Sequence, residues 1–243
     1  MSALLRRLAV VIPARNEELL LPRCLDSIQH AVERLAEQRP ELRTRVIVVL
    51  DRTTDRSLRV ARGRPGVVVV RSQAGKVGRA RDLGVYAALR WATGPQRGTW
   101  IANTDADSTV PPDWLCTQVR LAETCLDVVV GTVQPDPADL PDGVLAAWSA
   151  AHVLGEGHRH IHGANLGFRA DVHTRLGGFG GLKLHEDRDF VLAAAAAGLP
   201  LLATDQIRVT TSGRLHSRVR NGFADFLATQ NPDYGNARVD AKR

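Results

Sequence analysis

The chain has 243 residues, of which 44% are hydrophobic and 24% charged, so it can form one sizeable core without disulfides or a structural metal. This composition excludes an intrinsically disordered chain, and the length fits one domain. The formal net charge is +6, but residues 1–100 carry 19 basic and 9 acidic side chains, whereas residues 101–243 carry 13 and 17. A basic amino-terminal half suggests an anionic ligand such as nucleic acid, a membrane surface or a nucleotide phosphate.

The first hundred residues alternate short apolar runs with segments of helical periodicity. The apolar runs predict buried strands at 8–13, 45–50, 66–70 and 99–104. Apolar side chains at helical spacing predict helices at 21–35, 55–61 and 77–91. This alternation is typical of a parallel sheet covered by helices, in which ligands bind beyond the carboxyl ends of the strands.

The second half is less regular. Its apolar runs predict strands at 127–134, 163–169 and 207–211. Its helical patterns predict helices at 144–154, 186–197 and 213–228. We therefore expect a single α/β domain over residues 1–230, with a mostly parallel sheet flanked by helices, followed by a polar tail at 231–243.

The compartment is predicted from the cysteines and the apolar runs. The three cysteines show neither CxxC spacing nor a disulfide framework, which indicates a reducing, cytoplasmic location. The longest apolar run, 191–203, is interrupted by Gly198 and Pro200 and is too short to span a bilayer. We expect no transmembrane segment, although a peripheral membrane contact is compatible with the basic charge.

Polar clusters follow each predicted strand of the first half, at 13–18, 51–55, 75–82 and 105–107. In the last of them, Asp105 and Asp107 are two residues apart at a strand end, where both carboxylates can reach a divalent cation that bridges two phosphates. Paired aspartates are also common in turns, so the triplet alone does not identify a metal site. Lys76, Arg79 and Arg81 near a helix start favour phosphate, or form a solvated basic face.

Two further clusters lie in the second half. Glu186 and Asp187 begin a predicted helix after a glycine-rich turn, where acidic residues either interact with the helix dipole or supply a general base under a closing loop. His158, His160 and His162 alternate along the chain without a cysteine or carboxylate at zinc spacing. We interpret these histidines as polar surface or acceptor-site residues.

Together, these segments resemble family-2 glycosyltransferases over roughly residues 8–200. Six blocks occur in the family's order: VIPARNEE (11–18), VVLDRTTD (48–55), GKVGRARDLG (75–84), NTDADSTVPPDWL (103–115), GANLGFRADV…LGGF (163–179) and HEDRDF (185–190). The resemblance implies a GT-A-like, Rossmann-like fold and an inverting enzyme that uses a nucleotide sugar. It also divides the domain into a nucleotide-sugar-binding half, 1–110, and an acceptor and catalytic half, 111–230.

The resemblance implies roles for individual residues. Asp187 would be the catalytic base, with Glu186 beside it in the Glu-Asp motif. Mg²⁺ or Mn²⁺ would be held by Asp107 and Asp105, and His216 is a loose match to a third ligand. Contacts to the nucleotide sugar would come from Pro13, Ala14, Arg15, Glu17, Asp51, Lys76, Arg81, Asp105 and Ala106. Arg79 and Arg214 are further candidates for the site.

The chain departs from the family pattern at three positions. Leu50 and Arg52 stand where Asp and Gly are usual, and Asp82 where Asn is common. The departures at Leu50 and Arg52 leave open a nucleotide-binding protein of the same fold without turnover. The QxxRW motif of processive synthases is absent, so we expect non-processive transfer.

A second enzyme class also fits the acidic block. Residues 105–109 match the DxDxT motif of HAD-type phosphatases, in which the first Asp is a nucleophile, but that motif normally follows the first strand of its fold. Nucleic-acid binding is disfavoured, because aromatic residues are only 5% and no basic stripe is interleaved with them. The sequence does not name the donor sugar, the base, the acceptor or the oligomeric state.

Overall fold

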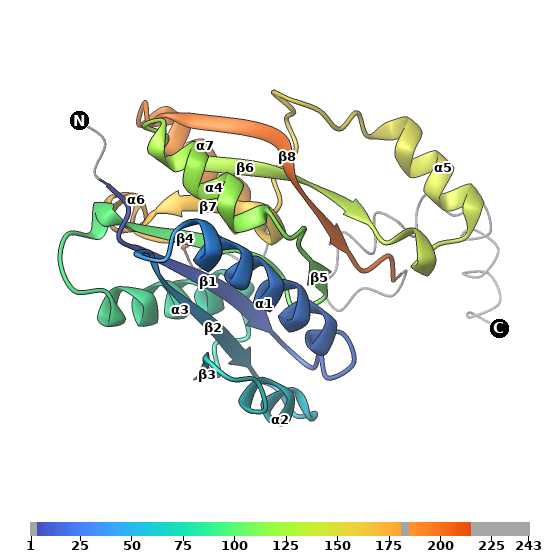
Figure 1. The fold of residues 1–243 in the computed structure, drawn as a ribbon. Coiled ribbons are helices and arrows are strands. Elements are labelled where there is room, and N and C mark those ends of the chain that lie inside the picture. The colour runs from blue at the N-terminus through green and yellow to red at the C-terminus, as the bar shows by residue number, and fades with distance from the viewer. Residues whose placement is uncertain (1–3, 181–184, 215–243) are drawn as a thin grey trace.

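The computed structural model describes residues 4–180 and 185–214. These residues form one eight-stranded sheet in the order β3-β2-β1-β4-β7-β6-β8-β5 (Figure 1). The strands are β1 Arg7–Ala14, β2 Arg43–Asp51, β3 Val67–Ser72, β4 Thr99–Asn103, β5 Ser108–Thr109, β6 Val128–Pro135, β7 Leu166–Arg169 and β8 Leu201–Thr211. The α-helices are α1 Leu21–Gln38, α2 Ser57–Arg62, α3 Val77–Trp91, α4 Trp114–Glu123, α5 Asp142–Ala151, α6 Ala170–Leu176 and α7 Glu186–Ala196. Short 3-10 turns are η1 Gln96–Gly98, η2 Pro137–Asp139 and η3 Gly163–Asn165.

The sheet is mixed. Strands β3, β2, β1 and β4 are mutually parallel, as predicted for the first half. Strand β7 is antiparallel to both β4 and β6, while β8 pairs parallel with β6 and antiparallel with β5. After β6 the chain stays at the carboxyl end of the sheet through η2 and α5, so β7 has to run back. The α/β fold with flanking helices is confirmed, with this antiparallel strand near its middle.

Two apolar layers cover the two faces of the sheet. One layer packs α1, α2 and α4 against side chains such as Leu8 and Ile12, and the other packs α3, α6 and α7 against alternating neighbours such as Val11. Figure 1 shows α1 and α4 lying along one face. Helix α3 comes very close to β1 because Gly84 has no side chain: a Cβ there would lie 2.3 Å from Cγ1 of Val11.

The sequence placed most strands and helices of the first half within a few residues. It missed β5, α4 and α6, and it took 163–169 as one strand, whereas Gly163–Asn165 forms η3 before β7. The backbone N–H of Asn165 donates to the carbonyl oxygen of His162 at 3.0 Å, which is the i to i−3 bond of a 3-10 turn. The buried side chain of Asn165 links β6 to β8, since its Nδ2 donates to the backbone oxygens of Thr132 (2.8 Å) and Ile207 (2.6 Å). The predicted helix residues from 215 onward and the predicted tail lie outside the described residues.

In the part of the chain that the structure describes, no helix is both long and apolar enough to cross a membrane.

Candidate active site

The loops after β1 and β2 are tied together at the carboxyl edge of the sheet. Asn16 has a φ of 55°, a conformation that Asn tolerates, and its Oδ1 accepts a hydrogen bond of 2.8 Å from the backbone N–H of Thr54. The N–H of Glu18 donates to Oδ2 of Asp55 at 2.9 Å. These bonds fix the PARNEE segment against the TTD segment, so the first two sequence blocks form one rigid rim.

The end of β2 also holds the loop before α3. The buried carboxylate of Asp51 accepts a 3.1 Å hydrogen bond from the N–H of Gly75. Arg52 donates from Nε to the carbonyl of Gln73 at 3.0 Å, and its guanidinium covers Gly75. Gly75 has a φ of +68°, and a Cβ there would lie 2.6 Å from Cζ of Arg52. Arg52, which stands where the family usually has Gly, is therefore part of this rim. Lys76, the residue after Gly75, is half-buried.

The three predicted donor-site residues without a polar side chain lie inside the protein. Pro13, Ala14 and Ala106 are buried, so they can shape a pocket through the backbone only. Arg15, in contrast, is exposed at the rim.

The predicted metal pair follows β4. The carboxylate of Asp107 is largely buried, and burial together with the negative charge of Asp105 raises its pKa to about 6, although Arg214 opposes this shift. Two carboxylates at this spacing repel each other, and a positive group between them would relieve that repulsion. His216 lies outside the described residues. Within these residues no group of three or more His, Cys, Asp or Glu side chains is arranged to hold a metal ion.

Arg214 connects this acidic pair to the first sequence block. Its two Nη atoms donate to the two carboxylate oxygens of Glu17 at 3.1 and 3.0 Å. Nη2 is also 2.8 Å from Oδ2 of Asp107. The guanidinium thus places a positive charge directly on the predicted metal ligand. Arg214 was named as a candidate from the sequence, but its pairing with Glu17, 197 residues away, could not be.

Arg81 connects the acidic pair to the Glu-Asp motif. It is 3% exposed, and Nη2 donates to Oδ1 of Asp105 at 2.7 Å while Nη1 pairs with Oε1 of Glu186. Burial alone would lower the pKa of Arg81, but Asp105, Glu186 and Asp187 raise it above its usual range. Arg81 therefore stays charged and fixes the start of α7 against the end of β4.

Glu186 and Asp187 differ in what they can reach. Glu186 is 4% exposed and is paired with Arg81. Asp187 is half-buried, its Oδ2 accepts a 2.6 Å hydrogen bond from the N–H of Gly163, and its Oδ1 accepts one of 2.8 Å from the N–H of Arg188. The GANLGFR block in the sequence did not indicate that the backbone N–H of its first residue, Gly163, orients Asp187.

The arrangement brings the predicted residues into two linked networks, Glu17–Arg214–Asp107 and Asp105–Arg81–Glu186. Because Asp105 and Asp107 lie on one short turn, both networks meet there. Asp51 and Lys76 belong to the neighbouring rim. The roles predicted for these residues stay predictions, but the structure gathers acidic groups and two cations at the carboxyl edge where ligands bind in such sheets.

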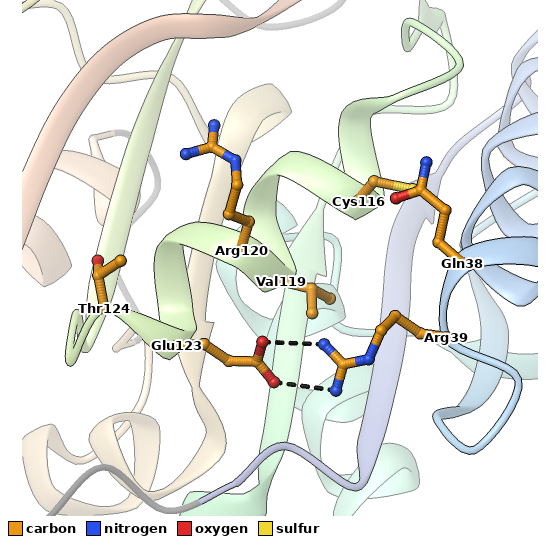
Figure 2. A pocket seen from close by; sticks show the side chains of 7 residues that line it. All are labelled: Gln38, Arg39, Cys116, Val119, Arg120, Glu123 and Thr124. Atoms are coloured by element: carbon orange, nitrogen blue, oxygen red, sulfur yellow. Dashed lines mark hydrogen bonds and ion pairs between the residues drawn. The ribbon is translucent and has the colours of Figure 1, made fainter.

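A separate cleft lies at the far end of α1. It has a volume of about 430 Å³ and lies between the end of α1 and α4, where Arg39 and Glu123 form a two-point ion pair at 2.9 and 3.0 Å (Figure 2). Helix α1 begins next to the carboxyl edge and spans 18 residues, about 27 Å at the usual rise per residue. The cleft is therefore remote from the acidic pair and takes no part in the site.

Comparison with known proteins decides the family. The sequence profile described as "Glycosyl transferase family 2" matches residues 9–175, which include the rim, the acidic pair and η3. The chain belongs to glycosyl transferase family 2. The predicted family is confirmed, and the predicted enzyme class is confirmed at the level of that family. The HAD-type alternative loses its support, since the DADST segment follows the fourth strand and Asp105 is paired with Arg81. No curated protein matches this chain.

Solved structures share the fold of this glycosyltransferase. S. aureus TarS, residues 1–349, has a TM-score of 0.61 at 15% identity, over 92% of this chain and 65% of that chain. Mannosyltransferase PcManGT from Pyrobaculum calidifontis, in complex with GDP-Man and Mn²⁺, has a TM-score of 0.60 at 22% identity, over 98% and 65%. M. tuberculosis glucosyl-3-phosphoglycerate synthase, in complex with Mn²⁺, uridine diphosphate and phosphoglyceric acid, has a TM-score of 0.51 at 18% identity, over 97% of this chain and 78% of that chain. The chain thus spans 65% of the first and second of these proteins.

Proposed function

We propose that this glycosyltransferase is an inverting, metal-dependent and non-processive enzyme that moves a sugar from a nucleotide-sugar donor to an acceptor hydroxyl. The observation that carries the proposal is the position of Arg81, which holds Asp105 of the acidic triplet and Glu186 of the Glu-Asp motif on one guanidinium. A donor-binding motif and a general-base motif are therefore adjacent in space, as a group transfer between two bound substrates requires.

The acidic pair fits a divalent cation. Oxygen ligands are those that Mg²⁺ and Mn²⁺ prefer. Burial and the negative charge of Asp105 raise the pKa of Asp107 to about 6, and a bound dication would offset the repulsion between these two carboxylates. Asp107 and Asp105 would hold the ion, with His216 as the proposed third ligand. When bound, such an ion neutralises the charge that develops on a departing nucleoside diphosphate.

Asp187 is the proposed general base. Its carboxylate accepts hydrogen bonds from the backbone N–H groups of Gly163 in η3 and Arg188 in α7 and is still partly accessible. It can therefore accept the proton of an acceptor hydroxyl as the oxygen attacks the anomeric carbon. Attack on the face opposite the leaving group inverts that carbon. Glu186 is buried against Arg81 and acts by positioning that guanidinium, so of the two predicted catalytic carboxylates only Asp187 would receive the proton.

The positions of these residues also support a division of the domain into a donor-binding half and an acceptor-binding half. We assign the rim of residues 13–18, Asp51 and Lys76 to the nucleotide, within the half formed by 1–110, and we assign 111–230 to the acceptor and the base. The absence of a QxxRW motif supports non-processive transfer. PcManGT binds GDP-Man with Mn²⁺, and the M. tuberculosis synthase binds uridine diphosphate with Mn²⁺, which supports a nucleotide-sugar donor and a divalent ion here.

The test is the thermal stability of the protein with nucleoside diphosphates. UDP or GDP with Mn²⁺ should raise the melting temperature, since a ligand that binds only the folded state stabilises it. Asp107→Ala should remove the part of the shift that depends on Mn²⁺, whereas Asp113→Ala, which changes an exposed aspartate before α4, should retain it. Failure of every nucleoside diphosphate to shift the melting temperature would contradict the proposal. A metal-dependent shift without sugar transfer would favour the nucleotide-binding protein instead.

A further inference from the structure

Four histidines and a tryptophan form a row of rings between α5 and η3. His160 is central, with ring centroids 5.3 Å from His152, 5.9 Å from His158 and 6.3 Å from His162. Trp148 continues the row beyond His152 at 4.7 Å, and the interplanar angles between these neighbours are at most 29°. We call the four imidazoles the histidine row. Each is half-buried, so each presents part of its ring to solvent.

The histidine row is anchored to the sheet. Nε2 of His158 is 3.2 Å from the carbonyl oxygen of Val130 in β6 and 3.3 Å from that of Thr204 in β8. The N–H of Gly157 donates to the carbonyl of Ala203 at 3.0 Å. Nδ1 of His152 hydrogen-bonds the carbonyl of Trp148 at 2.9 Å. These bonds hold the rings in place before any ligand binds.

The histidine row leads to the proposed base. His162 immediately precedes Gly163, whose N–H donates to Asp187, and the Asp187 carboxylate is the acidic group that acts on the His162 imidazole. At the other end, Trp148 packs with Leu140, and Leu140 lies against Gly213, the residue before Arg214. The row therefore lies between the Asp187 network and the segment that reaches Asp107.

Two rings of the row, those of His160 and His162, have lowered pKa values and are uncharged near neutral pH. Burial lowers the pKa of His162 to about 4, helped by the neighbouring histidines and opposed by Asp187. Burial, His152 and His158 also lower the pKa of His160. A neutral imidazole carries one N–H donor and one acceptor nitrogen. Stacked rings do not converge their nitrogens on one point, and the described residues contain no group able to hold a metal ion.

Two polar atoms in this region have no hydrogen-bond partner among the described residues. Trp148 is 4% exposed, and its buried Nε1 is unpartnered, as is Nδ1 of His158. Because Nε2 of His158 faces two carbonyl oxygens, it carries the proton, so Nδ1 is an acceptor. A buried donor and a buried acceptor are each unfavourable while they stay unpaired. A hydroxyl group can satisfy both kinds.

We infer that the histidine row is the acceptor subsite, and that its acceptor is an uncharged polyhydroxylated molecule, a saccharide or glycoside. This inference rests on the proposed function and deepens it. Neutral aromatic rings with paired donors and acceptors match the apolar ring faces and hydroxyls of a sugar. A phosphate or carboxylate would instead meet neutral rings beside the carboxylates of Asp187 and Glu156, which is unfavourable for an anion.

The test separates acceptor binding from donor chemistry. NMR resonances of the imidazole C–H groups are followed while methyl pyranosides of glucose, mannose and galactose, or 3-phosphoglycerate, are added with Mn²⁺ and a nucleoside diphosphate present. We expect a methyl pyranoside to shift these resonances and 3-phosphoglycerate not to. In His160→Ala the apparent affinity for that sugar should fall at least about tenfold, and Trp148→Phe, which keeps one aromatic ring but removes the Nε1 donor, should lower it less. His30→Ala changes an exposed histidine on α1 and is the matched control.

The donor signal serves as the internal reference. If nucleoside diphosphates with Mn²⁺ raise the melting temperature of His160→Ala as they do that of the wild type, loss of sugar binding belongs to the row. Sugar binding that is unchanged in His160→Ala, shifts caused by 3-phosphoglycerate alone, or no shift with any of these probes would overturn the inference and leave the proposed function intact. Absence of any donor signal in the wild type would overturn both.

Discussion

Nη2 of Arg81 donates a 2.7 Å hydrogen bond to Oδ1 of Asp105, and the same guanidinium pairs with Glu186. Asp105 begins the acidic triplet, and Glu186 begins the helix that carries the proposed base. A buried arginine in α3 thus sets the position of two segments that the sequence keeps far apart. The side chain of Glu186 is closely packed against α3, since a Cβ on Gly78 would lie 2.8 Å from Cγ of Glu186.

Replacing Arg81 with alanine should therefore affect folding and activity together. Removing one partner from a buried ion pair leaves uncompensated charge and typically costs about 3–5 kcal/mol of unfolding free energy. Guanidinium chloride denaturation measures this loss, and a transfer assay should show turnover lost as well. Arg90→Ala is the control, because Arg90 lies on the same helix, is exposed and is not a predicted residue of the site. Equal losses in the two variants would contradict the special role of Arg81.

Gly163 provides a second test of the same packing. A Cβ there would lie 2.3 Å from Nη2 of Arg81, and the residue also supplies the N–H that orients Asp187. We expect Gly163→Ala to lower the unfolding free energy by about 1–3 kcal/mol, the usual cost of overpacking, and to reduce turnover because the guanidinium has to shift. Gly155→Ala, in the same half of the chain, adds a Cβ with nothing within 4 Å and should leave both unchanged.

The hydrophobic periodicity of the sequence correctly predicted those strands and helices whose pattern is set by neighbouring residues. Strand β1 was found because Ala9 and Val11 face one layer while Leu8, Val10 and Ile12 face the other, so the whole run is apolar. The four polar clusters were expected at one edge because parallel strands end together. The antiparallel direction of β7 is set by its pairing with β4 and β6, and Asn165 bonds to β6 and β8; these long-range contacts have no local signature.

The candidate site divides in the same way. Asp105, Asp107 and Asp187 could be named because each lies in a short motif whose spacing carries chemistry. The pairing of these carboxylates could not be predicted, because it comes from contacts across the chain: Arg214 pairs with Asp107, and Arg81 with Asp105. The histidine row was noticed as an alternation of three histidines, but its continuation to His152 and Trp148 requires the fold to bring the end of α5 alongside.

Arg214 should compete with a divalent cation. Its Nη2 is 2.8 Å from Oδ2 of Asp107, so it puts a positive charge where the ion is proposed to bind. Arg214→Ala should tighten Mn²⁺ binding in the absence of nucleotide by about fivefold, which corresponds to about 1 kcal/mol for one charge at about 4 Å in a solvated site. Calorimetry at pH 8 measures this, well above the pKa of about 6 at Asp107, so that protons do not compete. Arg208→Ala, which removes an ion pair with Asp205 instead, should leave Mn²⁺ binding unchanged.

Asp187→Asn should separate donor binding from turnover. Asparagine keeps the size of the side chain and an oxygen that can accept the N–H of Gly163, so the melting-temperature shift caused by a nucleoside diphosphate with Mn²⁺ should be retained. The amide cannot accept the proton of the acceptor hydroxyl, and loss of a general base typically lowers the rate of the chemical step by about 10²–10⁴-fold. Asp189→Asn is the matched control, since Asp189 is exposed in the same first turn of α7. Transfer activity that survives in Asp187→Asn but not in Asp189→Asn would move the proposed base from Asp187 to Asp189, one half-turn further along the helix.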